Sequence, residues 1–348
     1  MLFKRRGHDN KEGNGGGDGN RPRVVVITGA SAGVGRAAAR AFARRGAHVA
    51  LLARGRDGLK AAAREVEKAG AKALPIQVDV ADAGEVMRAA EEVEKKLGPI
   101  DVWVNNAMAT VFGSVKENAP EEFQRVTEVT YLGSVYGTKA ALNYMLPRNR
   151  GVIVQVGSAL AVRSIPLQSA YCAAKHAVSG FLESLRSELL HDKSKVRITE
   201  LMMPGMNTPQ FGWARNHLSH RPRPMAPVYS PDIAARAIVY ASEHPRRIIE
   251  VGASSVAIAF AQKWIPGLLD RYLARSAYSG QQIRNEPENG RHRDNLYSPV
   301  GGDHGAHGRF SRQSYRHSPE LWLTTHRGWL MMAAGAGALW WAARRAAR

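Results

Sequence analysis

Short runs of β-branched and other apolar residues alternate with longer segments of helical character from residue 23 to about residue 252. The runs are VVVIT, HVALLA, KALPIQV, IDVWVNN, GVIVQVGS, VRITELMM and RIIEVG. Strand-like runs separated by helical segments are typical of βαβ units. The pattern therefore predicts an α/β fold with a doubly wound parallel sheet of about seven strands and helices on both faces.

Both ends of the chain depart from this alternation. Residues 1–22 are polar, basic and glycine-rich and lack the apolar stretch of a secretory signal, which predicts a flexible tail. Residues 23–279 should then form one domain. Residues 280–326 are rich in glycine, histidine, arginine, asparagine and proline, which predicts an extended polar tail. Within it, the HGAH stretch is interpreted as a solvated loop rather than a metal site.

The segment GMNTPQFGWARNHLSHRPRPMAPVYSP, residues 205–231, interrupts the alternation. It is too long for an ordinary connection between a strand and a helix, and long loops of compact domains are usually lids or binding segments. We expect such a role here, with a decorative insertion as the alternative.

Residues 327–348 are again apolar. The stretch 329–343 carries no charge, has tryptophans at both ends and is bounded by arginines. As a helix it would extend roughly 22 Å, less than the hydrocarbon core of about 30 Å. Interfacial tryptophans and snorkelling arginines are nevertheless typical of membrane anchors. A membrane anchor and a helix packed on the protein or in an oligomer interface both fit this segment.

The composition excludes some classes of protein. The net charge is +19, but the arginines are scattered among alanines and form no dense basic block with interleaved aromatic residues. Sequence-specific nucleic-acid binding is therefore not expected. The single cysteine, Cys172, allows no intrachain disulfide and suits a reducing compartment, which favours a cytoplasmic location, with membrane association through the C-terminus left open.

The first apolar run leads into a glycine-rich turn and an alanine-rich helix, VVVITGASAGVGRAAARAFARRG. Gly29, Gly33 and Gly35 permit a tight turn and a close approach of the backbone to a pyrophosphate, which the helix N-terminus attracts. Gly33-x-Gly35-x-x-Ala38 also fits the dinucleotide fingerprint in its strand-turn-helix context. The stretch predicts a Rossmann-type dinucleotide site.

The end of the second run, LLARGR, bears on which dinucleotide binds. An NAD site places an acid there for the ribose 2′-hydroxyl, whereas an NADP site offers arginine to the 2′-phosphate. Ala53 leaves the acidic position without a carboxylate, while Arg54 and Arg36 can bind a phosphate. NADP(H) is therefore favoured over NAD(H). NAD(H) remains the alternative because the nearby Asp57 could supply the acid that an NAD site needs.

These features resemble the short-chain dehydrogenase/reductase (SDR) family in its compact single-domain form, over about residues 23–252. Thr28-Gly29-x-x-x-Gly33-x-Gly35 is similar to the cofactor loop of the family, and Asn105-Asn106-Ala107 to its Asn-Asn-Ala-Gly signature, with Met108 in place of the last glycine. Together with the two arginines, the resemblance implies cofactor contacts from Thr28, Gly29, Ser31, Gly33, Val34, Gly35, Arg36, Arg54, Asp79, Val80, Asn105, Ala107, Tyr171, Lys175 and Thr208.

The resemblance also implies a catalytic set. Tyr171 and Lys175 lie one helical turn apart in AYCAAKHA, and Ser158 precedes them at the spacing of the family. Tyr171 would exchange a proton with the substrate oxygen, Lys175 would lower the pKa of Tyr171 and hold the nicotinamide ribose, and Ser158 would orient the substrate. No metal is expected.

Two positions depart from the family pattern. Thr130 stands where the family has a fourth catalytic residue, an asparagine, which puts the proton relay behind Lys175 in question. The PGMNTP stretch is one residue tighter than usual, although Thr208 should still meet the carboxamide of the cofactor.

The leading hypothesis is thus an NADP-dependent oxidoreductase that interconverts a carbonyl and a secondary or primary alcohol by hydride transfer. The substrate is expected to be a small molecule, apolar if the C-terminal segment contacts a membrane, and the resemblance implies a homo-oligomer. The alternative is a dinucleotide-binding sensor or scaffold with little catalysis, which the threonine at position 130 suggests.

Overall fold

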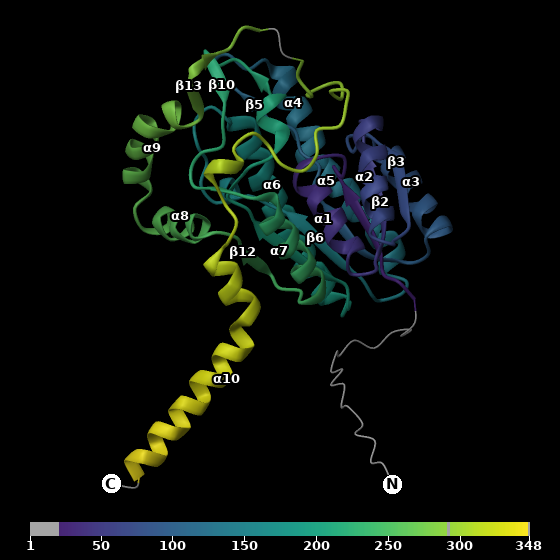
Figure 1. Ribbon diagram of the computed structural model, residues 1–348, viewed down its shortest axis with the longest axis vertical. Helices are drawn as coiled ribbons and strands as arrows, with labels where there is room; N and C mark the ends of the chain where they lie inside the picture. The colour runs from purple at the N-terminus through teal and green to yellow at the C-terminus, as the bar shows by residue number, and fades with distance from the viewer. Residues whose placement is uncertain (1–20, 291–292, 347–348) are drawn as a thin grey trace, which may run out of the picture.

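The computed structural model describes residues 21–290 and 293–346. Within these ranges one parallel sheet has the strand order β12-β7-β6-β4-β1-β2-β3 (Figure 1). Its strands are β1 (Val24–Thr28), β2 (His48–Ala53), β3 (Ala73–Gln77), β4 (Ile100–Asn105), β6 (Val152–Val156), β7 (Arg197–Met202) and β12 (Ile248–Glu250). Every strand lies in one of the apolar runs, so the prediction of a doubly wound, Rossmann-like α/β fold is confirmed.

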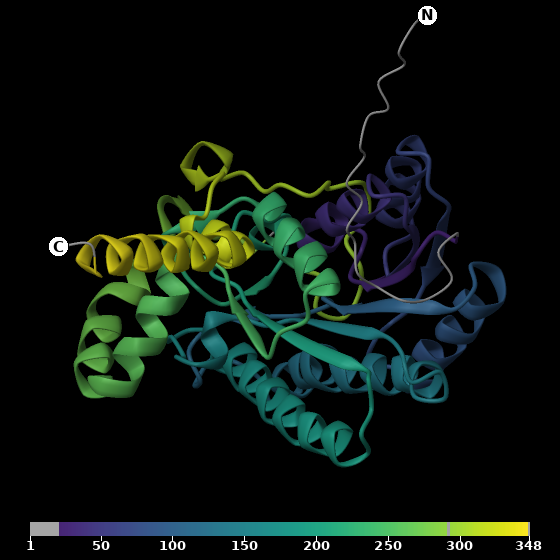
Figure 2. The same ribbon diagram turned by 90° about the horizontal axis from the view of Figure 1, so that it is seen from below.

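Helices cover both faces of the sheet, as Figure 2 shows. One face is packed by α1 (Gly33–Ala43), α2 (Arg56–Lys68) and α7 (Pro231–Glu243). The other is packed by α3 (Ala83–Lys96), α4 (Pro120–Thr127), α5 (Gly133–Met145) and α6 (Ser169–His191). These two layers bury the inner strands β1, β2, β4 and β6 on both sides, which explains why these strands are unbroken apolar runs, while the edge strands β3 and β12 are only partly buried.

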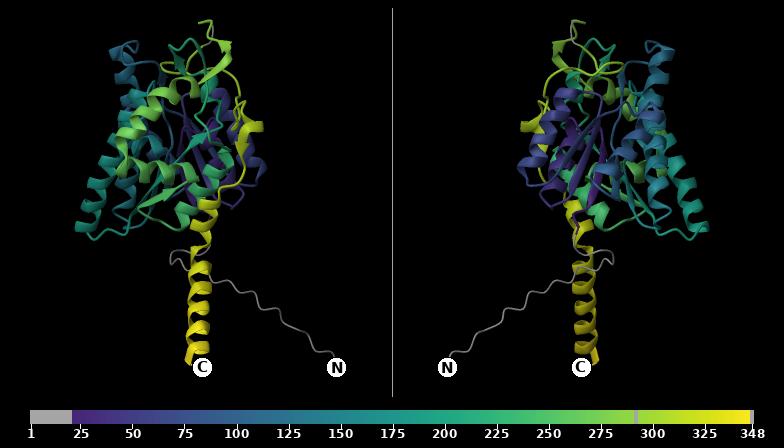
Figure 3. Two further views of the ribbon diagram at one scale, coloured as in Figure 1. Left: turned by 90° about the vertical axis from the view of Figure 1, so that its left-hand side faces the viewer. Right: turned by 90° about the vertical axis from the view of Figure 1, so that its right-hand side faces the viewer.

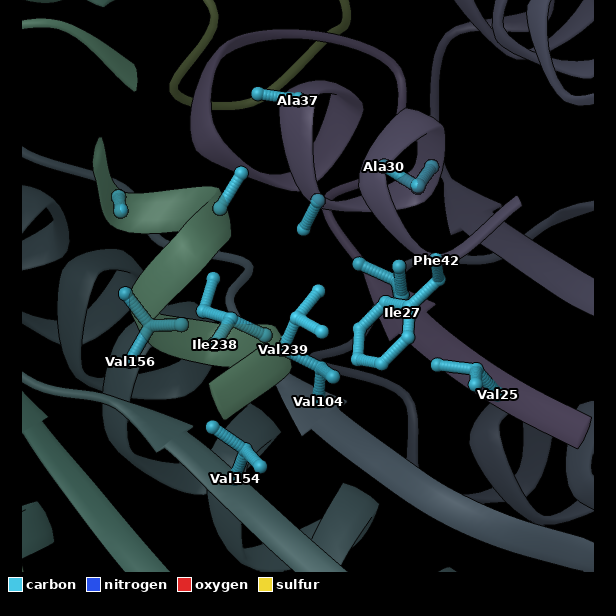
Figure 4. Close-up of a cluster of buried hydrophobic side chains, with 14 of the residues drawn as sticks. Val25, Ile27, Ala30, Ala37, Phe42, Val104, Val154, Val156, Ile238 and Val239 are labelled. Carbon is cyan, nitrogen blue, oxygen red and sulfur yellow. The ribbon is translucent and has the colours of Figure 1, made fainter. Parts of the chain in front are cut away.

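Alternate residues of β1 enter different cores because successive side chains of a strand point to opposite faces. Val25 and Ile27 pack with Phe42 of α1 and Ile238 of α7 in the core drawn in Figure 4. Their neighbour Val26 belongs to the core on the opposite face. The strand order reverses direction at β1, which pairs with both β2 and β4, and open α/β sheets bind ligands at the carboxyl ends of the strands at such a point.

The segment 205–231 folds into short strands that pair with distant parts of the chain. These are β8 (Gly205–Met206), β9 (Arg215–Asn216), β10 (His220–Pro222) and β11 (Val228–Tyr229). β9 pairs with β5 (Val111–Phe112), β10 with β13 (Gln282–Pro287), and β11 with β8 and β14 (Ser314–Tyr315). The described residues of 280–326, a range expected to form a polar tail, pair through β13 and β14 with the domain, and Leu296 and Phe310 are buried there.

Three helices follow the sheet, α8 (Ala253–Trp264), α9 (Pro266–Gly280) and α10 (Pro319–Ala346). Figure 3 shows α10 projecting away from the domain, and its Met332, Trp340 and Trp341 are exposed. Within the described residues, no helix combines the length and the apolar character needed to cross a membrane.

Candidate active site

The turn between β1 and α1 depends on its glycines. Gly29 and Gly33 have φ angles of +66° and +58°, which glycine adopts without strain. At Gly35 a Cβ would come within 2.4 Å of the Gly29 carbonyl oxygen, so this position admits no side chain without a shift of the backbone. Because these three residues have no side chains, the backbone of the turn stays accessible at the carboxyl end of β1, where α1 begins.

Thr28 and Asn106 join this turn to the end of β4. The hydroxyl of Thr28 accepts hydrogen bonds from the backbone N–H groups of Asn106 and Ala107, at 2.9 and 3.0 Å. The Asn106 amide donates to the Thr28 and Gly29 carbonyls, at 2.8 and 3.2 Å. The Asn105 side chain lies inside the core instead. Its amide nitrogen donates hydrogen bonds to α5, and its amide oxygen accepts one from the indole of Trp103. Thr28 and Asn105 therefore position the loops rather than line the cavity.

Ser158, Tyr171 and Lys175 line the same cavity as the glycine-rich turn. Ser158 follows β6 and is buried, and its hydroxyl accepts a hydrogen bond from the Leu160 N–H at 3.1 Å. The other two side chains leave the first turns of α6, four residues apart, and the Lys175 ammonium lies 5.6 Å from the centre of the Tyr171 ring. The three residues identified from their spacing thus meet at one place.

Lys175 is almost fully buried, with 2% of its surface exposed. Its Nζ donates a hydrogen bond to the Val156 carbonyl at 2.7 Å. Burial lowers the pKa of Lys175 to about 8, and Glu200, a buried acid of β7, opposes that shift. The pKa of Glu200 is itself raised, chiefly by burial.

The pKa of Tyr171 shifts in the direction opposite to the one expected. Burial of the phenol raises it above its ordinary value, and the hydrogen bond with Ser158 offsets the shift only in part. The lowering expected from Lys175, whose ammonium lies 5.6 Å from the ring centre and donates to the Val156 carbonyl, does not outweigh the effect of burial on the pKa of Tyr171. The phenol is therefore protonated at neutral pH, and its raised pKa makes it a weaker acid until a cation or a hydrogen bond stabilises the phenolate.

Thr130, the residue in place of the family asparagine, lies in a π-helical turn, Glu128–Leu132, between α4 and α5. Its side chain is completely buried. The hydroxyl donates to the Ala109 carbonyl and accepts from the Ala109 N–H, both at 3.0 Å. These bonds hold the segment after β4, and Thr130 is not among the residues that line the cavity.

The two arginines proposed for the 2′-phosphate have different surroundings. Arg54 lines the cavity, and its guanidinium donates to backbone carbonyls of residues 295–297. Arg36 is 2% exposed and pairs with Glu65 at 2.9 Å and with Asp303 at 2.7 Å. Burial disfavours its charge, but the two carboxylates outweigh that effect and raise the pKa of Arg36. Arg36 lies outside the cavity lining.

Of the residues predicted from sequence, the cavity is lined by Gly29, Ser31, Gly33, Val34, Arg54, Asp79, Val80, Ala107, Ser158, Tyr171, Lys175 and Thr208. Asp79 also forms an ion pair with Arg125. Sequence reasoning missed the lining residues Met203, Gln210, Trp213, Asn295, Pro299, Val300, Gly302 and His304. For the last five the only signal was the unusual polar composition after residue 280, which was interpreted as a tail.

A parallel sheet with a glycine-rich turn and a Ser-Tyr-Lys set in one cavity defines a dinucleotide-dependent oxidoreductase. The model of the short chain dehydrogenase family matches residues 23–217. The chain therefore belongs to the short-chain dehydrogenase/reductase family and is an SDR oxidoreductase, as its motifs predicted.

Individual relatives agree with this assignment. The chain is 34% identical to the uncharacterized oxidoreductase YxnA of Bacillus subtilis, over 94% of this chain and 92% of that protein. It is 36% identical to the bovine dehydrogenase/reductase SDR family member 7B, over 53% of this chain and 58% of that protein. The alcohol dehydrogenase of the archaeon Thermococcus sibiricus, solved with 5-hydroxy-NADP, superposes with a TM-score of 0.57 at 29% identity, covering 66% of this chain and 95% of the other.

Proposed function

We propose that this protein interconverts a carbonyl compound and a secondary or primary alcohol with NADP(H) as cofactor, and that Tyr171 is its general acid and base. The observation that carries the proposal is the position of Ser158, Tyr171 and Lys175 in the cavity that the glycine-rich turn also lines. A dinucleotide along this cavity would extend from Arg54 and Asp79 at one end to the catalytic residues at the other.

The residues present fit such a cofactor. A Cβ on Gly33 would meet the Thr208 side chain at 3.3 Å, so glycine keeps the passage between the turn and Thr208 wide. NADP(H) is preferred because Ala53 offers no carboxylate to a ribose and Arg54 offers a guanidinium to a phosphate. The archaeal relative solved with an NADP analogue supports this preference. When bound, the nicotinamide ring would supply or accept the hydride.

The side chains of the chain itself handle the proton. In reduction, the Tyr171 hydroxyl donates its proton to the carbonyl oxygen while hydride reaches the carbonyl carbon, which gives the alcohol. Ser158 donates a hydrogen bond to the same oxygen, and the Lys175 ammonium stabilises the phenolate that Tyr171 becomes. Because burial raises the pKa of Tyr171, release of its proton depends on this stabilisation by Lys175 and Ser158.

The substrate end of the cavity favours an apolar carbonyl compound. Met108, Met203, Met206 and Trp213 line the same cavity as the catalytic residues. Thioether and aromatic side chains adapt to apolar groups of varied shape. A ketone or aldehyde with a hydrocarbon substituent is therefore the expected class.

The test is NADPH oxidation with a panel of ketones and aldehydes of increasing chain length. Tyr171→Phe removes the proton donor and should lower kcat by about 10²- to 10⁴-fold while NADPH binding persists. Tyr278→Phe is the matched control, since that tyrosine is 48% exposed on α9. Tight NADPH binding without turnover of any substrate would contradict the enzyme proposal and favour a dinucleotide sensor.

A further inference from the structure

Residues 294–311, called the strap below, lie across the cavity of the proposed cofactor. Figure 1 shows the strap within the yellow-green chain between β13 and α10. Asn295, Pro299, Val300, Gly302 and His304 of the strap line the cavity together with the glycine-rich turn. The strap lies outside residues 23–217, which match the family model, so it is an addition to the shared part of the fold.

One end of the strap is fastened to Arg54. The Arg54 guanidinium donates to the carbonyls of Leu296 and Tyr297, at 3.2 and 3.1 Å, and also to that of Asn295. The Leu296 carbonyl accepts a further bond from Arg125 at 3.2 Å, and the Leu296 side chain is completely buried. Three main-chain carbonyl oxygens therefore accept hydrogen bonds from the guanidinium that is expected to bind the 2′-phosphate.

The middle of the strap is fastened to the glycine-rich turn. The N–H of Gly33, the first residue of α1, donates to the Gly305 carbonyl at 3.1 Å. Asp303 pairs with the buried Arg36 at 2.7 Å. The Gly302 N–H donates to Asp57 at 3.0 Å. The strap thus uses a backbone donor at the helix N-terminus, where the pyrophosphate of a dinucleotide would lie.

The strap also contacts the segment 205–231 on the substrate side. The Gly308 N–H donates to the Asn207 carbonyl at 3.0 Å, and the Phe310 N–H donates to the Asn207 side chain at 3.0 Å. The His304 ring packs edge-on against Trp213 with a centroid distance of 4.6 Å. Movement of the strap would therefore affect both ends of the cavity.

These contacts share one chemical feature: carbonyl oxygens of the strap accept from Arg54 and from the Gly33 N–H, the donors that phosphate oxygens would use. We infer that the strap is an internal competitor for the phosphates of the cofactor, and that it must release these donors for a dinucleotide to bind. This inference rests on the proposed function. It makes the strap a determinant of cofactor affinity and specificity that the shared fold does not supply.

Competition of this kind also discriminates between the two cofactors. A 2′-phosphate is an anion that can bond the guanidinium in a bidentate geometry with opposite charges on the two partners, whereas the strap carbonyls that accept from Arg54 are neutral. The ribose 2′-hydroxyl of NAD(H) has no such charge. NADP(H) should therefore displace the strap from Arg54 more readily than NAD(H), which offers no charged group to replace the strap carbonyls there and should bind more weakly.

A reversible crosslink tests the inference. A Cβ built on Gly55 would lie 3.6 Å from the Cβ of Pro299, within the spacing of about 3.5–4.5 Å found in disulfides. The double variant Gly55→Cys/Pro299→Cys can therefore be locked by oxidation and released by a thiol, while the native Cys172 is buried. NADPH association is followed by stopped-flow fluorescence in both states of the full-length protein, with Gly55→Cys alone as the control.

We expect oxidation to slow NADPH association about tenfold or more, because only molecules with a released strap are competent to bind. Reduction should restore the association rate. Addition of the thiol should not change the association rate of the single variant Gly55→Cys. Equal rates in the oxidised and reduced double variant would overturn the strap inference and leave the proposed function intact. Failure of the wild-type protein to bind NADPH would overturn both.

A second variant loosens the strap. At Gly308 a Cβ would come within 2.4 Å of the Thr208 carbonyl oxygen, so Gly308→Ala must separate the strap from the backbone of Asn207 and Thr208, where its N–H groups bond to Asn207. We expect it to bind NADPH faster than wild type, with a larger gain than for NADH. At Gly301, also in the strap, an added Cβ would meet no described atom within 4 Å, so Gly301→Ala is the matched control. Slower or unchanged NADPH association in Gly308→Ala, with Gly301→Ala equal to wild type, would contradict the inference.

Discussion

The hydroxyl of Thr130 and the backbone of Ala109 exchange two hydrogen bonds, each 3.0 Å long. Both residues are buried, so removal of the hydroxyl leaves a backbone N–H and a carbonyl without a replacement from water. Thr130→Ala should therefore lower the free energy of unfolding by about 1–3 kcal/mol. Urea unfolding followed by circular dichroism measures the loss.

Thr127→Ala is the control for this prediction. The Thr127 hydroxyl donates to the Phe123 carbonyl one turn back on the exposed side of α4, where water can replace it. Its removal should change stability by less than about 0.5 kcal/mol. An equal decrease in the free energy of unfolding in both variants would show that the buried bonds to Ala109 stabilise the protein no more than an exposed bond does.

Glycine is required at position 35 but not at position 180, although both positions are in helices. Gly35→Ala places a methyl group 2.4 Å from the Gly29 carbonyl oxygen and should cost about 1–3 kcal/mol through overpacking. At Gly180 an added Cβ would meet no described atom within 4 Å, so Gly180→Ala should gain about 0.5–1 kcal/mol from helix propensity. Thermal unfolding of the two variants should shift in opposite directions, and a stabilised Gly35→Ala would refute the assigned geometry of the turn.

Asp101, at the start of β4, is a buried carboxylate that pairs with two partly exposed arginines. Its carboxylate accepts from the Val24 N–H at 2.9 Å, from Arg21 at 2.9 Å and from Arg150 at 2.8 Å. Burial alone would raise the pKa of Asp101, but the bonds from Arg21, Val24 and Arg150 outweigh it and lower the pKa. The native state therefore binds the proton of Asp101 less readily than the unfolded chain does.

The sign of the resulting pH dependence follows from linkage. Because the folded pKa is below the unfolded value, the stabilisation is present above that value and is lost as the pH falls through the folded pKa. Asp101→Asn should lower stability at pH 7 by about 1–3 kcal/mol, since a buried carboxylate that accepts three hydrogen bonds is lost, and should flatten the acid limb of the unfolding curve. Asp192→Asn, on an exposed carboxylate after α6, should leave that limb as in wild type. An acid limb unchanged in Asp101→Asn would contradict the assignment.

The parts of this molecule that are specified locally could be predicted from the sequence. The strand β1 and the turn after it are adjacent in the chain, and Tyr171 and Lys175 lie on one helix, so spacing alone brought them together. The strap could not be predicted in this way, because its bond from the Arg54 guanidinium to the Tyr297 carbonyl joins residues far apart in the chain. Its polar composition resembles that of a solvated tail, and no periodicity marks a segment whose anchors are main-chain carbonyls.

The electrostatic surroundings of the site residues could not be predicted from the sequence either. Arg36 was expected to offer its charge to the 2′-phosphate, but its ion pair with Asp303 depends on the fold of the strap. The expected effect of Lys175 on Tyr171 assumed that proximity would decide the pKa, whereas burial of the phenol has the larger effect. Charge pairs and desolvation depend on which side chains are enclosed together, and sequence spacing does not report that.

Lys175 gives the protein a pH dependence in the alkaline range. Its pKa is about 8 in the folded state because burial disfavours the ammonium, whereas an unfolded lysine has a pKa near 10.4. Between these values the unfolded chain binds more protons than the native state, so stability rises with pH through this window, by up to about 3 kcal/mol. Lys175→Met should abolish that rise, which urea unfolding at pH 7.5 and 10 measures. Reductase activity should move the opposite way, since loss of the ammonium above about pH 8 removes the cation that stabilises the Tyr171 phenolate. A rise in stability that persists in Lys175→Met would assign it to another group.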